Sequence, residues 1–318
     1  MLAHQGRGLS GFVQALIRRH AIYKAYVLLA LTTLFWAGNS IAGKLAVGHV
    51  SPMILVTLRW AGVMAVLYLF GKARIAADWP AIRPRLCYLL FLGALGFTVF
   101  SVALYYALVY TTAINVSILQ GGMPLFVFAA SFVLFSSRIG VGQAVGFLCS
   151  FIGVIIIAMR GEWANLIGLD INFGDALMLV AIVAYGIYTA ALRSKPRMHW
   201  VSLMFALCLG ATLSSLPMLA FEAARGKTIL PDMQGWLAVI YIVIFPSLIA
   251  QAFYIRAVDL IGANRAGLFI NLLPVWGALL AVAILGEGFR LYHAIALIMI
   301  LAGIGLAEYG GRRLGRRE

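Results

Sequence analysis

The chain has 318 residues, of which 64% are hydrophobic and 11% are charged, and its net charge is +14. Soluble domains are about half apolar and about a quarter charged, so this composition excludes a single water-soluble core. The excess of apolar residues instead predicts a protein that is embedded in a membrane.

In chain order, ten apolar blocks are long enough to cross a bilayer, because a helix needs about 20 apolar residues to do so. Blocks of this length without strict alternation favour helices over a β-barrel. We therefore expect an all-α membrane protein with ten transmembrane helices. The blocks lie at about 26–47, 52–71, 86–108, 113–135, 141–159, 174–193, 200–221, 235–255, 263–285 and 290–309.

The 24 lysines and arginines are distributed unevenly over the loops that these blocks define. If the first helix starts in the cytoplasm, most of them fall in loops and tails on the cytoplasmic side, as the positive-inside rule requires. Both termini are therefore expected to be cytoplasmic. The positive charge then reflects topology and attraction to the headgroups of the lipid bilayer, and it predicts no nucleic-acid partner.

The two halves of the chain resemble each other. When the sequence is shifted by 150 positions, Pro124 falls on Pro274 and Gly153 falls on Gly303 without a gap. Each half holds five blocks, an odd number, so the second half must enter the membrane from the opposite side. Inverted repeats of this kind are typical of transporters, with the substrate site near the bilayer midplane. The predicted division is a cytoplasmic segment 1–25, a first five-helix repeat 26–159, a linker 160–173, a second five-helix repeat 174–309 and a basic cytoplasmic tail 310–318.

Three parts of the chain resemble one transporter family. They are TLFWAGNSIAGKLA with SPMILVTLRWAGVMAVLYLF, then YYALVYTTAINVSILQGGMPLFVFAAS, and then GANRAGLFINLLPVWGALLAVAILGEGF. These parts are similar to EamA-type members of the drug/metabolite transporter superfamily, and most similar to bacterial amino-acid exporters of the YddG type. The resemblance implies ten helices arranged as a basket, export of small metabolites, and a multi-pass protein of the bacterial inner (plasma) membrane.

Two basic residues lie within the predicted spans. If the second helix starts at Pro52, Arg59 lies about 10 Å into the membrane, where an arginine costs about 2.5–3.5 kcal/mol on insertion scales. It should therefore face the protein interior, either bracing neighbouring helices or contacting substrate directly. Lys44 lies near the outer end of its span, where it either extends to the headgroups or forms a cation at the outer mouth of the pathway.

Polar and aromatic residues inside the spans are the other candidates for a substrate cavity. Trp36 and Asn39 share one helix face because they are three residues apart, and Tyr185 and Tyr188 repeat this spacing in the symmetry-related span. We expect both pairs to face a shared cavity whose aromatic walls suit an amino acid with an apolar side chain. Membrane-interface anchoring and helix–helix contacts are the alternative roles. The further candidates are Tyr105, Tyr106, Gln120, Gln251, Tyr254, Asn271 and Trp276.

Two prolines and one glycine motif bear on motion and assembly. Pro124 and Pro274 should bend their helices because each removes a backbone hydrogen bond, and they act either as hinges or in packing alone. The sequence GQAVG at 142–146 has the small-residue spacing that lets helices approach closely, which is weak evidence for an oligomer contact. We expect a monomer or a weak homo-oligomer.

The ten acidic residues all fall in loops, tails or helix ends, although Asp175 and Glu308 lie close to a span. Proton-coupled pumps and exporters of cations usually hold a carboxylate inside the membrane. This pattern favours a zwitterionic, neutral or anionic substrate, and facilitative or exchange transport by alternating access. The leading hypothesis is export of amino acids, with aromatic or large neutral ones favoured. The alternatives are an exporter of another small metabolite or drug, and a proton-coupled carrier of the same superfamily.

Two other classes of protein fit less well. A membrane enzyme would need paired catalytic groups, but the histidines lie in tails or near span ends and no HExxH occurs. We therefore predict no enzymatic activity, no metal and no cofactor. A channel would need a continuous polar lining, whereas the repeat predicts alternating access. The expected partners are a small-molecule substrate and the lipid bilayer.

Overall fold

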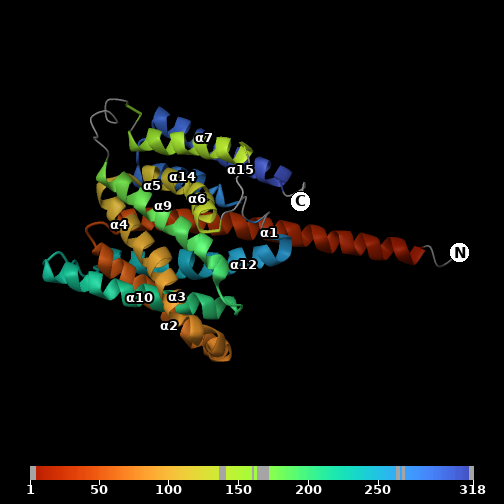
Figure 1. Ribbon diagram of the computed structural model, residues 1–318, viewed down its shortest axis with the longest axis horizontal. Helices are drawn as coiled ribbons and strands as arrows, with labels where there is room; N and C mark the ends of the chain where they lie inside the picture. Colours follow the sequence, from red (N-terminus) through yellow and green to blue (C-terminus); the bar gives the residue numbers. More distant parts are fainter. Residues whose placement is uncertain are drawn as a thin grey trace.

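The computed structural model describes residues 5–135, 141–159, 161–162, 172–262, 266 and 269–314, which contain helices and no strands (Figure 1). Two segments, η2 and η4, are π-helical, and η1 and η3 are single 3-10 turns. The elements are α1 (Gln5–Leu45), α2 (Pro52–Ile82), η1 (Arg83–Arg85), α3 (Leu86–Gly93), η2 (Ala94–Val99), α4 (Phe100–Tyr110), α5 (Ala113–Gln120), α6 (Met123–Phe135), α7 (Val141–Ala158), α9 (Phe173–Ala191), η3 (Leu192–Ser194), α10 (Trp200–Ala224), α11 (Met233–Ile242), η4 (Val243–Ile249), α12 (Ala250–Ile261), α14 (Leu273–Leu285) and α15 (Leu291–Leu314).

Five helical segments of the described residues are long and apolar enough to span a membrane, and a sixth is added if α5 and α6, which meet at a 40° bend, form one span. Three shorter apolar helices accompany them. The five are Ile22–Leu45, Pro52–Tyr110, Phe173–Ser194, Trp200–Ala224 and Met233–Ile261, and the shorter ones are Ala144–Ile157, Leu273–Leu285 and Leu291–Leu306. An all-helical membrane protein is thereby confirmed. The count of ten crossings, the inverted orientation of the halves and the repeat boundaries stay predictions.

The long apolar segment from Pro52 to Tyr110 turns back on itself. Its contacts with α10 are Ser51 to Glu222, Thr57 to Ser215, Thr98 to Ala211 and Tyr106 to Glu222. From Ser51 to Thr57 the residue number of the partner in α10 falls from 222 to 215, whereas from Thr98 to Tyr106 it rises from 211 to 222. The two parts therefore run in opposite directions along the same helix, as two successive spans would.

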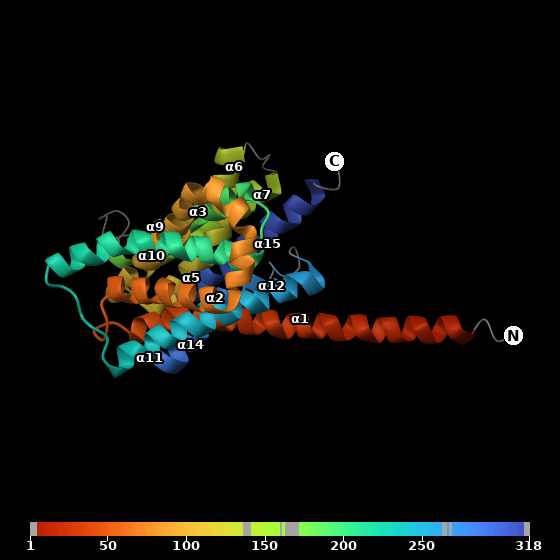
Figure 2. The same cartoon turned by 90° about the horizontal axis from the view of Figure 1, so that it is seen from below.

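The bundle is layered, with α7 packed along α15 on one side and α2 packed near α10 on the other (Figure 1). The N-terminal part of α1 projects beyond the other helices, and the C-terminal end of α15 lies at the same end of the molecule (Figure 2). We call the opposite end, where residues 46–51 and 225–232 connect helices, the distal end. The predicted segment 1–25 is mostly the start of α1, and most of the predicted linker 160–173 lies outside the described residues.

The glycine motif at 142–146 contributes to packing within the chain. Gly146 is buried, and a side chain on Gly303 of α15 would collide with its carbonyl oxygen. Small residues let the backbones of two helices come this close. The motif therefore serves the contact between α7 and α15, so its spacing supplies no evidence for an oligomer.

A second close contact joins α3 to α10 through two glycines. A Cβ on Gly93 would collide with the carbonyl oxygen of Leu207, and one on Gly210 would collide with that of Leu90. A backbone oxygen cannot rotate away as a flexible side chain can. The crossing therefore requires a hydrogen atom at both positions.

We predict that Gly93→Ala and Gly210→Ala each lower the free energy of unfolding by about 1–3 kcal/mol, the usual cost of overpacking. The matched control is Gly305→Ala, because no atom lies within 4 Å of a Cβ at that exposed helical position. Thermal unfolding of the purified protein in detergent measures the effect. Unfolding temperatures equal to that of the control would contradict the tight crossing.

Candidate functional site

The side chain of Arg59 lies inside the bundle and is 7% exposed. Its Nε donates to the Ser247 hydroxyl at 3.0 Å, and its Nη1 donates to Oδ1 of Asn39 at 3.2 Å and to the Tyr105 hydroxyl at 2.8 Å. The Tyr105 hydroxyl in turn donates to Asn39 Oδ1 at 2.9 Å. The prediction that Arg59 faces the interior is therefore confirmed.

The groups that hold Arg59 come from both halves of the chain. Asn39, Arg59 and Tyr105 belong to α1, α2 and α4, whereas Ser247 belongs to the π-helical η4 of the second half. All three acceptors are neutral, and no carboxylate oxygen of the described residues lies within 4.0 Å of the guanidinium. A buried charge usually has a counter-ion, because desolvation costs several kcal/mol per ion. Arg59 is thus a buried cation that neutral groups stabilise.

The indole N–H of Trp60 is a second polar group in this region that lacks a partner in the described residues. The guanidinium carbon of Arg59 lies 4.4 Å from the centre of the Trp60 ring, a cation–π contact. The Trp60 side chain is 5% exposed, and within the described residues its Nε1 has no hydrogen-bond partner. Buried donors are nearly always paired, so an orphaned N–H next to a cation is suited to an acceptor that binds there. Sequence reasoning missed Trp60, although its place next to Arg59 in the chain was a usable signal.

A row of aromatic rings continues from Trp60. Trp60 stacks on Phe97 at 4.3 Å between ring centres, and Phe97 lies 5.7 Å from Tyr188. Tyr188 lies 5.4 Å from Tyr185, which lies 5.2 Å from Phe100. These spacings suit favourable aromatic pairs. The row joins α2 to α9 through η2 and α4, so the predicted pair Tyr185 and Tyr188 does reach the surroundings of Arg59.

The other predicted pair takes part in different contacts. Trp36 donates its Nε1–H to the carbonyl oxygen of Pro246 at 3.1 Å, and its ring lies 5.4 Å from that of Tyr254. Asn39, one turn further along α1, binds Arg59 and Tyr105 instead. That the pair Trp36 and Asn39 and the pair Tyr185 and Tyr188 line one shared cavity stays a prediction.

Three of the remaining candidates lie around the two helix interruptions. Gln120 is buried and donates to Ser40 Oγ at 2.9 Å, so it ties α5 to α1. Asn271 lies in the turn before α14, and Trp276 follows in α14 with its Nε1 buried and without a partner in the described part of the chain. The fourth candidate, Gln251, is half-buried in α12.

Contrary to the prediction, the two prolines lie at the starts of helices and not inside them. Pro124 and Pro274 each occupy the second residue of a helix, α6 and α14, where a missing N–H leaves no hydrogen bond unmade. The interruptions are the turns just before them, Gly121–Gly122 and Asn271–Leu272. Gly121 lies against Pro274, so the two interruptions meet. The helices are therefore broken near the predicted positions, but by turns rather than by interior prolines, and a hinge role stays a prediction.

Lys44 caps a helix at the distal end. Its Nζ donates to the carbonyl oxygens of Leu108 and Thr111, both at 2.7 Å, which lie at the C-terminal end of α4. Cations are favourable there because the last carbonyls of a helix carry partial negative charge. Lys44 also lines a cavity of about 440 Å³ with Arg290 and His293. It points to the protein rather than away from it, which disfavours extension to the headgroups.

Two carboxylates near the ends of candidate spans are more buried than the sequence analysis anticipated. Asp175 is fully buried in the first turn of α9 and accepts from Thr111 and Asn115. Glu222 is 5% exposed in the last turn of α10 and accepts from Ser51 and Tyr106. Both lie at helix ends, as predicted, but neighbouring elements cover them. The absence of carboxylates from the membrane-spanning part therefore no longer supports uncoupled transport.

Loops of the two halves are joined at the distal end. His49 Nδ1 lies 2.7 Å from Oδ2 of Asp232, and the backbone N–H of Ser51 donates to the carbonyl of Ile229 at 3.0 Å. Asp232 also accepts from the N–H of Gly235 at the start of α11. The hydrogen bond from His49, followed by the one from Gly235, holds the pKa of Asp232 below its usual range. These contacts hold residues 46–51 against residues 225–232.

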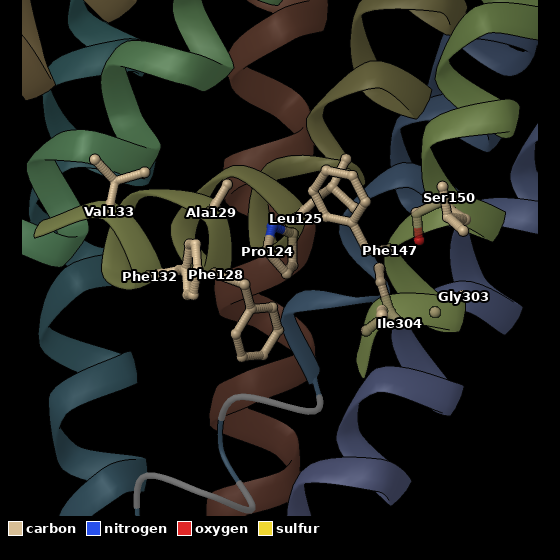
Figure 3. A pocket seen from close by; sticks show the side chains of 13 residues that line it. Pro124, Leu125, Phe128, Ala129, Phe132, Val133, Phe147, Ser150, Gly303 and Ile304 are labelled. Carbon is tan, nitrogen blue, oxygen red and sulfur yellow. The ribbon is translucent and has the colours of Figure 1, made fainter. Parts of the chain in front are cut away.

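A separate apolar pocket of about 420 Å³ lies between α6, α7 and α15 (Figure 3). The rings of Phe128 and Phe132 from α6 and Phe147 from α7 gather around it, next to Ile304 of α15. It contains none of the predicted site residues other than Pro124. In the described residues no group of three or more His, Cys, Asp or Glu side chains is arranged to hold a metal ion.

Long apolar helices that enclose a buried cation and interrupted segments define a multi-pass membrane protein of the transporter type. The model of the EamA-like transporter family matches the chain twice, over residues 23–159 and 172–308. The chain therefore belongs to the EamA-like transporter family, whose members are generally not enzymes.

Similar proteins cover most of the chain. The chain is 26% identical over 284 residues to an uncharacterized transporter, YetK, of Bacillus subtilis, which covers 88% of this chain and 85% of that protein. It is 29% identical over 291 residues to an uncharacterized transporter of Archaeoglobus fulgidus, which covers 88% and 96%. A solved structure described as "Crystal structure of protein" aligns with a TM-score of 0.60 at 23% identity, over 91% of this chain and 98% of that chain, and shows the same fold.

We predict that Asn39→Ala lowers the free energy of unfolding by about 1–3 kcal/mol, because Arg59 Nη1 and the Tyr105 hydroxyl lose a shared acceptor. Asn39→Asp should instead match or exceed the wild-type stability, since its carboxylate supplies the missing counter-charge. Thermal unfolding in detergent compares the two variants. Equal destabilisation by both would show that Arg59 is not short of negative charge.

We predict that Asp232→Asn lowers the unfolding temperature at neutral pH and that this difference vanishes in acid. A carboxyl whose pKa is lowered by folding stabilises the fold above its ordinary pKa of about 4, and this stabilisation is lost as the pH falls through the lower folded pKa. Asparagine keeps the capping role at the start of α11, so the comparison isolates the charge. Melting curves between about pH 7 and about pH 3 test this, with exposed Glu162→Gln as the control. A difference that persists at the acid limit would contradict it.

Proposed function

We propose that the chain is a carrier that exports amino acids from a bacterium across the inner membrane by alternating access, as exporters of the YddG type do. In this proposal ten helices form two inverted repeats, 26–159 and 174–309, and both termini are cytoplasmic. Transport is facilitative or by exchange, and aromatic or large neutral amino acids are favoured. The single observation that carries the proposal is the buried Arg59, held by both halves and lacking a carboxylate partner in the described structure.

Two findings support the repeated architecture. The family model matches each half separately, over 23–159 and 172–308. Irregular backbone also recurs at equivalent positions: the π-helical segments η2 and η4 begin at Ala94 and Val243, and the turns begin at Gly121 and Asn271. A shift of 149 or 150 positions superposes each pair. Because π-helical turns and broken helices are concentrated at functional sites, their recurrence points to two matched sets of moving parts.

The charge of Arg59 supports a substrate with a carboxylate group. Nη2 has no hydrogen-bond acceptor among the described residues, and the guanidinium lies over the ring of Trp60, whose Nε1 also lacks a partner there. A carboxylate can accept two parallel hydrogen bonds from a guanidinium, and this geometry is the strongest that arginine makes. Substrate binding would then supply the counter-charge that the protein itself does not place there.

The aromatic row supports an apolar side chain on that substrate. The rings of Trp60, Phe97 and Tyr188 follow one another away from Arg59. Aromatic walls with a few convergent polar groups are typical of small-molecule sites. An aromatic or large neutral amino acid would place its carboxylate at Arg59 and its side chain along these rings.

The meeting of the two interruptions supports alternating access. Gly121 lies against Pro274, and a side chain on Gly277 of α14 would collide with Ser117 of α5. The broken helices therefore cross at close range, where a small rotation of one moves the other. This is the arrangement expected when two inverted halves rock around a central site.

A second candidate, a proton-coupled carrier, is favoured by the burial of Asp175 and Glu222 in candidate spans. Intramembrane carboxylates are common proton relays. The two candidates share the substrate site and differ in their response to a pH gradient.

The test is uptake of labelled amino acids into liposomes that contain the purified protein, with and without a pH gradient. We expect saturable uptake and counterflow of at least one aromatic or large neutral amino acid without a gradient. Uptake of none would exclude amino-acid transport, and strict dependence on the gradient would select the proton-coupled candidate. Linear, non-saturating flux would indicate a channel.

We predict that Asn39→Asp abolishes this uptake although the protein stays folded, because its carboxylate occupies Arg59 in place of the substrate. A loss of at least tenfold in transport rate is expected. The exposed Glu162→Gln is the matched control and should transport normally. Normal transport by Asn39→Asp would remove Arg59 from the substrate site.

A further inference from the structure

A buried carboxylate at the distal end, Glu222, has no role in the leading proposal above, which places the substrate at Arg59. Glu222 lies in the last turn of α10 and is 5% exposed. Its Oε2 accepts from Ser51 Oγ at 2.5 Å and its Oε1 accepts from the Tyr106 hydroxyl at 2.8 Å. Three elements therefore hold this carboxylate in place: the start of α2, α4 and α10.

The contacts of Glu222 leave its charge unbalanced. Both donors are neutral hydroxyls, and no basic nitrogen of the described residues lies within 4.0 Å of its carboxylate oxygens. Breaking or lacking the partner of a buried charge is expensive, and two hydroxyls offset only part of that cost. Each carboxylate oxygen can accept more than one hydrogen bond, so acceptor capacity remains.

The side chain of Glu222 borders open space. One cavity of about 220 Å³ and another of about 460 Å³ are both lined by Glu222 and Tyr106. Tyr105 and Tyr110 also line the smaller one. A carboxylate in a cavity lined by tyrosine side chains is an arrangement that recognises an organic ammonium group, since a carboxylate offers ionic hydrogen bonds and aromatic rings offer cation–π attraction.

Lys227 lines both cavities as well and is itself exposed. Its charge has the same sign as an ammonium ligand and therefore opposes binding of one. Because the lysine stem is flexible and exposed, its replacement leaves the buried part of the site intact. Lys227 thus provides a variant whose effect should be opposite to that of a change in Glu222.

The site is distinct from that of Arg59. Ser51, which binds Glu222, precedes Arg59 by eight residues, or about 12 Å along α2. The two charges are connected through neighbouring side chains of α4, since the Tyr105 hydroxyl binds Arg59 and the Tyr106 hydroxyl binds Glu222. Because Ser51 and Arg59 lie at different heights along α2, we treat the two charges as belonging to separate sites.

We propose that Glu222, with Tyr105 and Tyr106, forms a binding site for a primary ammonium group at the distal end. For an amino-acid substrate it is a second station that holds the ammonium group, separate from the place where Arg59 holds the carboxylate. The site itself does not require the transported substrate to be an amino acid.

The test measures binding of 2-phenylethylamine, phenylalanine and 3-phenylpropionate to the purified full-length protein by calorimetry. The first probe lacks the carboxylate and the third lacks the ammonium group. Glu222→Gln should weaken binding of 2-phenylethylamine by at least tenfold and leave that of 3-phenylpropionate unchanged. Glu222→Asp should retain part of the affinity, and the exposed Glu162→Gln should retain all of it.

Equal affinity of folded wild type and Glu222→Gln for 2-phenylethylamine, or no binding of it by the wild type, would overturn the site. If Glu222→Gln does not fold, the affinity of Lys227→Gln for 2-phenylethylamine is measured instead. Higher affinity than that of the wild type supports the site, and equal affinity refutes it. The outcome is separate from that of the transport assay. Liposomes that take up no amino acid would end the proposed function, while binding of the amine that depends on Glu222 would still establish the ammonium site.

Discussion

The constraint on which the architecture depends is the burial of the Arg59 guanidinium without a counter-ion in the described part of the chain. A charge in an apolar bundle must be surrounded by oriented dipoles, and here they are the amide of Asn39 and the hydroxyls of Tyr105 and Ser247. These groups come from α1, α4 and η4, so the first half of the chain cannot satisfy Arg59 without the second. The same contact that stabilises the fold thereby joins the two halves of the chain, at the site that we propose for the substrate.

One of these groups, the hydroxyl of Ser247, comes from an irregular helix. In a lipid environment every backbone polar group needs a partner, so departures from regular α-helix are costly unless the protein uses them. In η4 the hydroxyl of Ser247 faces Arg59 and also donates to the carbonyl of Ile242, while the carbonyl of Pro246 accepts from Trp36. The π-helical segment therefore exposes a hydroxyl and a carbonyl that a regular helix would direct elsewhere.

The distal end is organised by charges placed on helix termini. Lys44 binds the last carbonyls of α4, and Glu287 accepts from the first backbone N–H groups of α5, at Ala113 and Ile114. These contacts agree with the partial charges of helix ends. Glu222 differs, because hydroxyls hold it and a cavity borders it. A buried cation held by Tyr105 and a buried anion held by Tyr106 give the molecule an electrical polarity along α4.

The sequence by itself determined the class of the protein and much of its outline. Hydropathy is a property of consecutive residues, so the helical membrane architecture, the interior position of Arg59 and the regions of the two helix breaks could all be derived from local pattern. Only the tertiary structure decided which partners meet. Ser247 lies 188 residues from Arg59, and Glu222 lies 116 residues from Tyr106. No local pattern encodes such pairs, because they arise when separate helices pack. For the same reason the sequence did not show that neighbouring elements cover Glu222 at its helix end, or that Gly146 of the motif at 142–146 packs against Gly303 of the same chain.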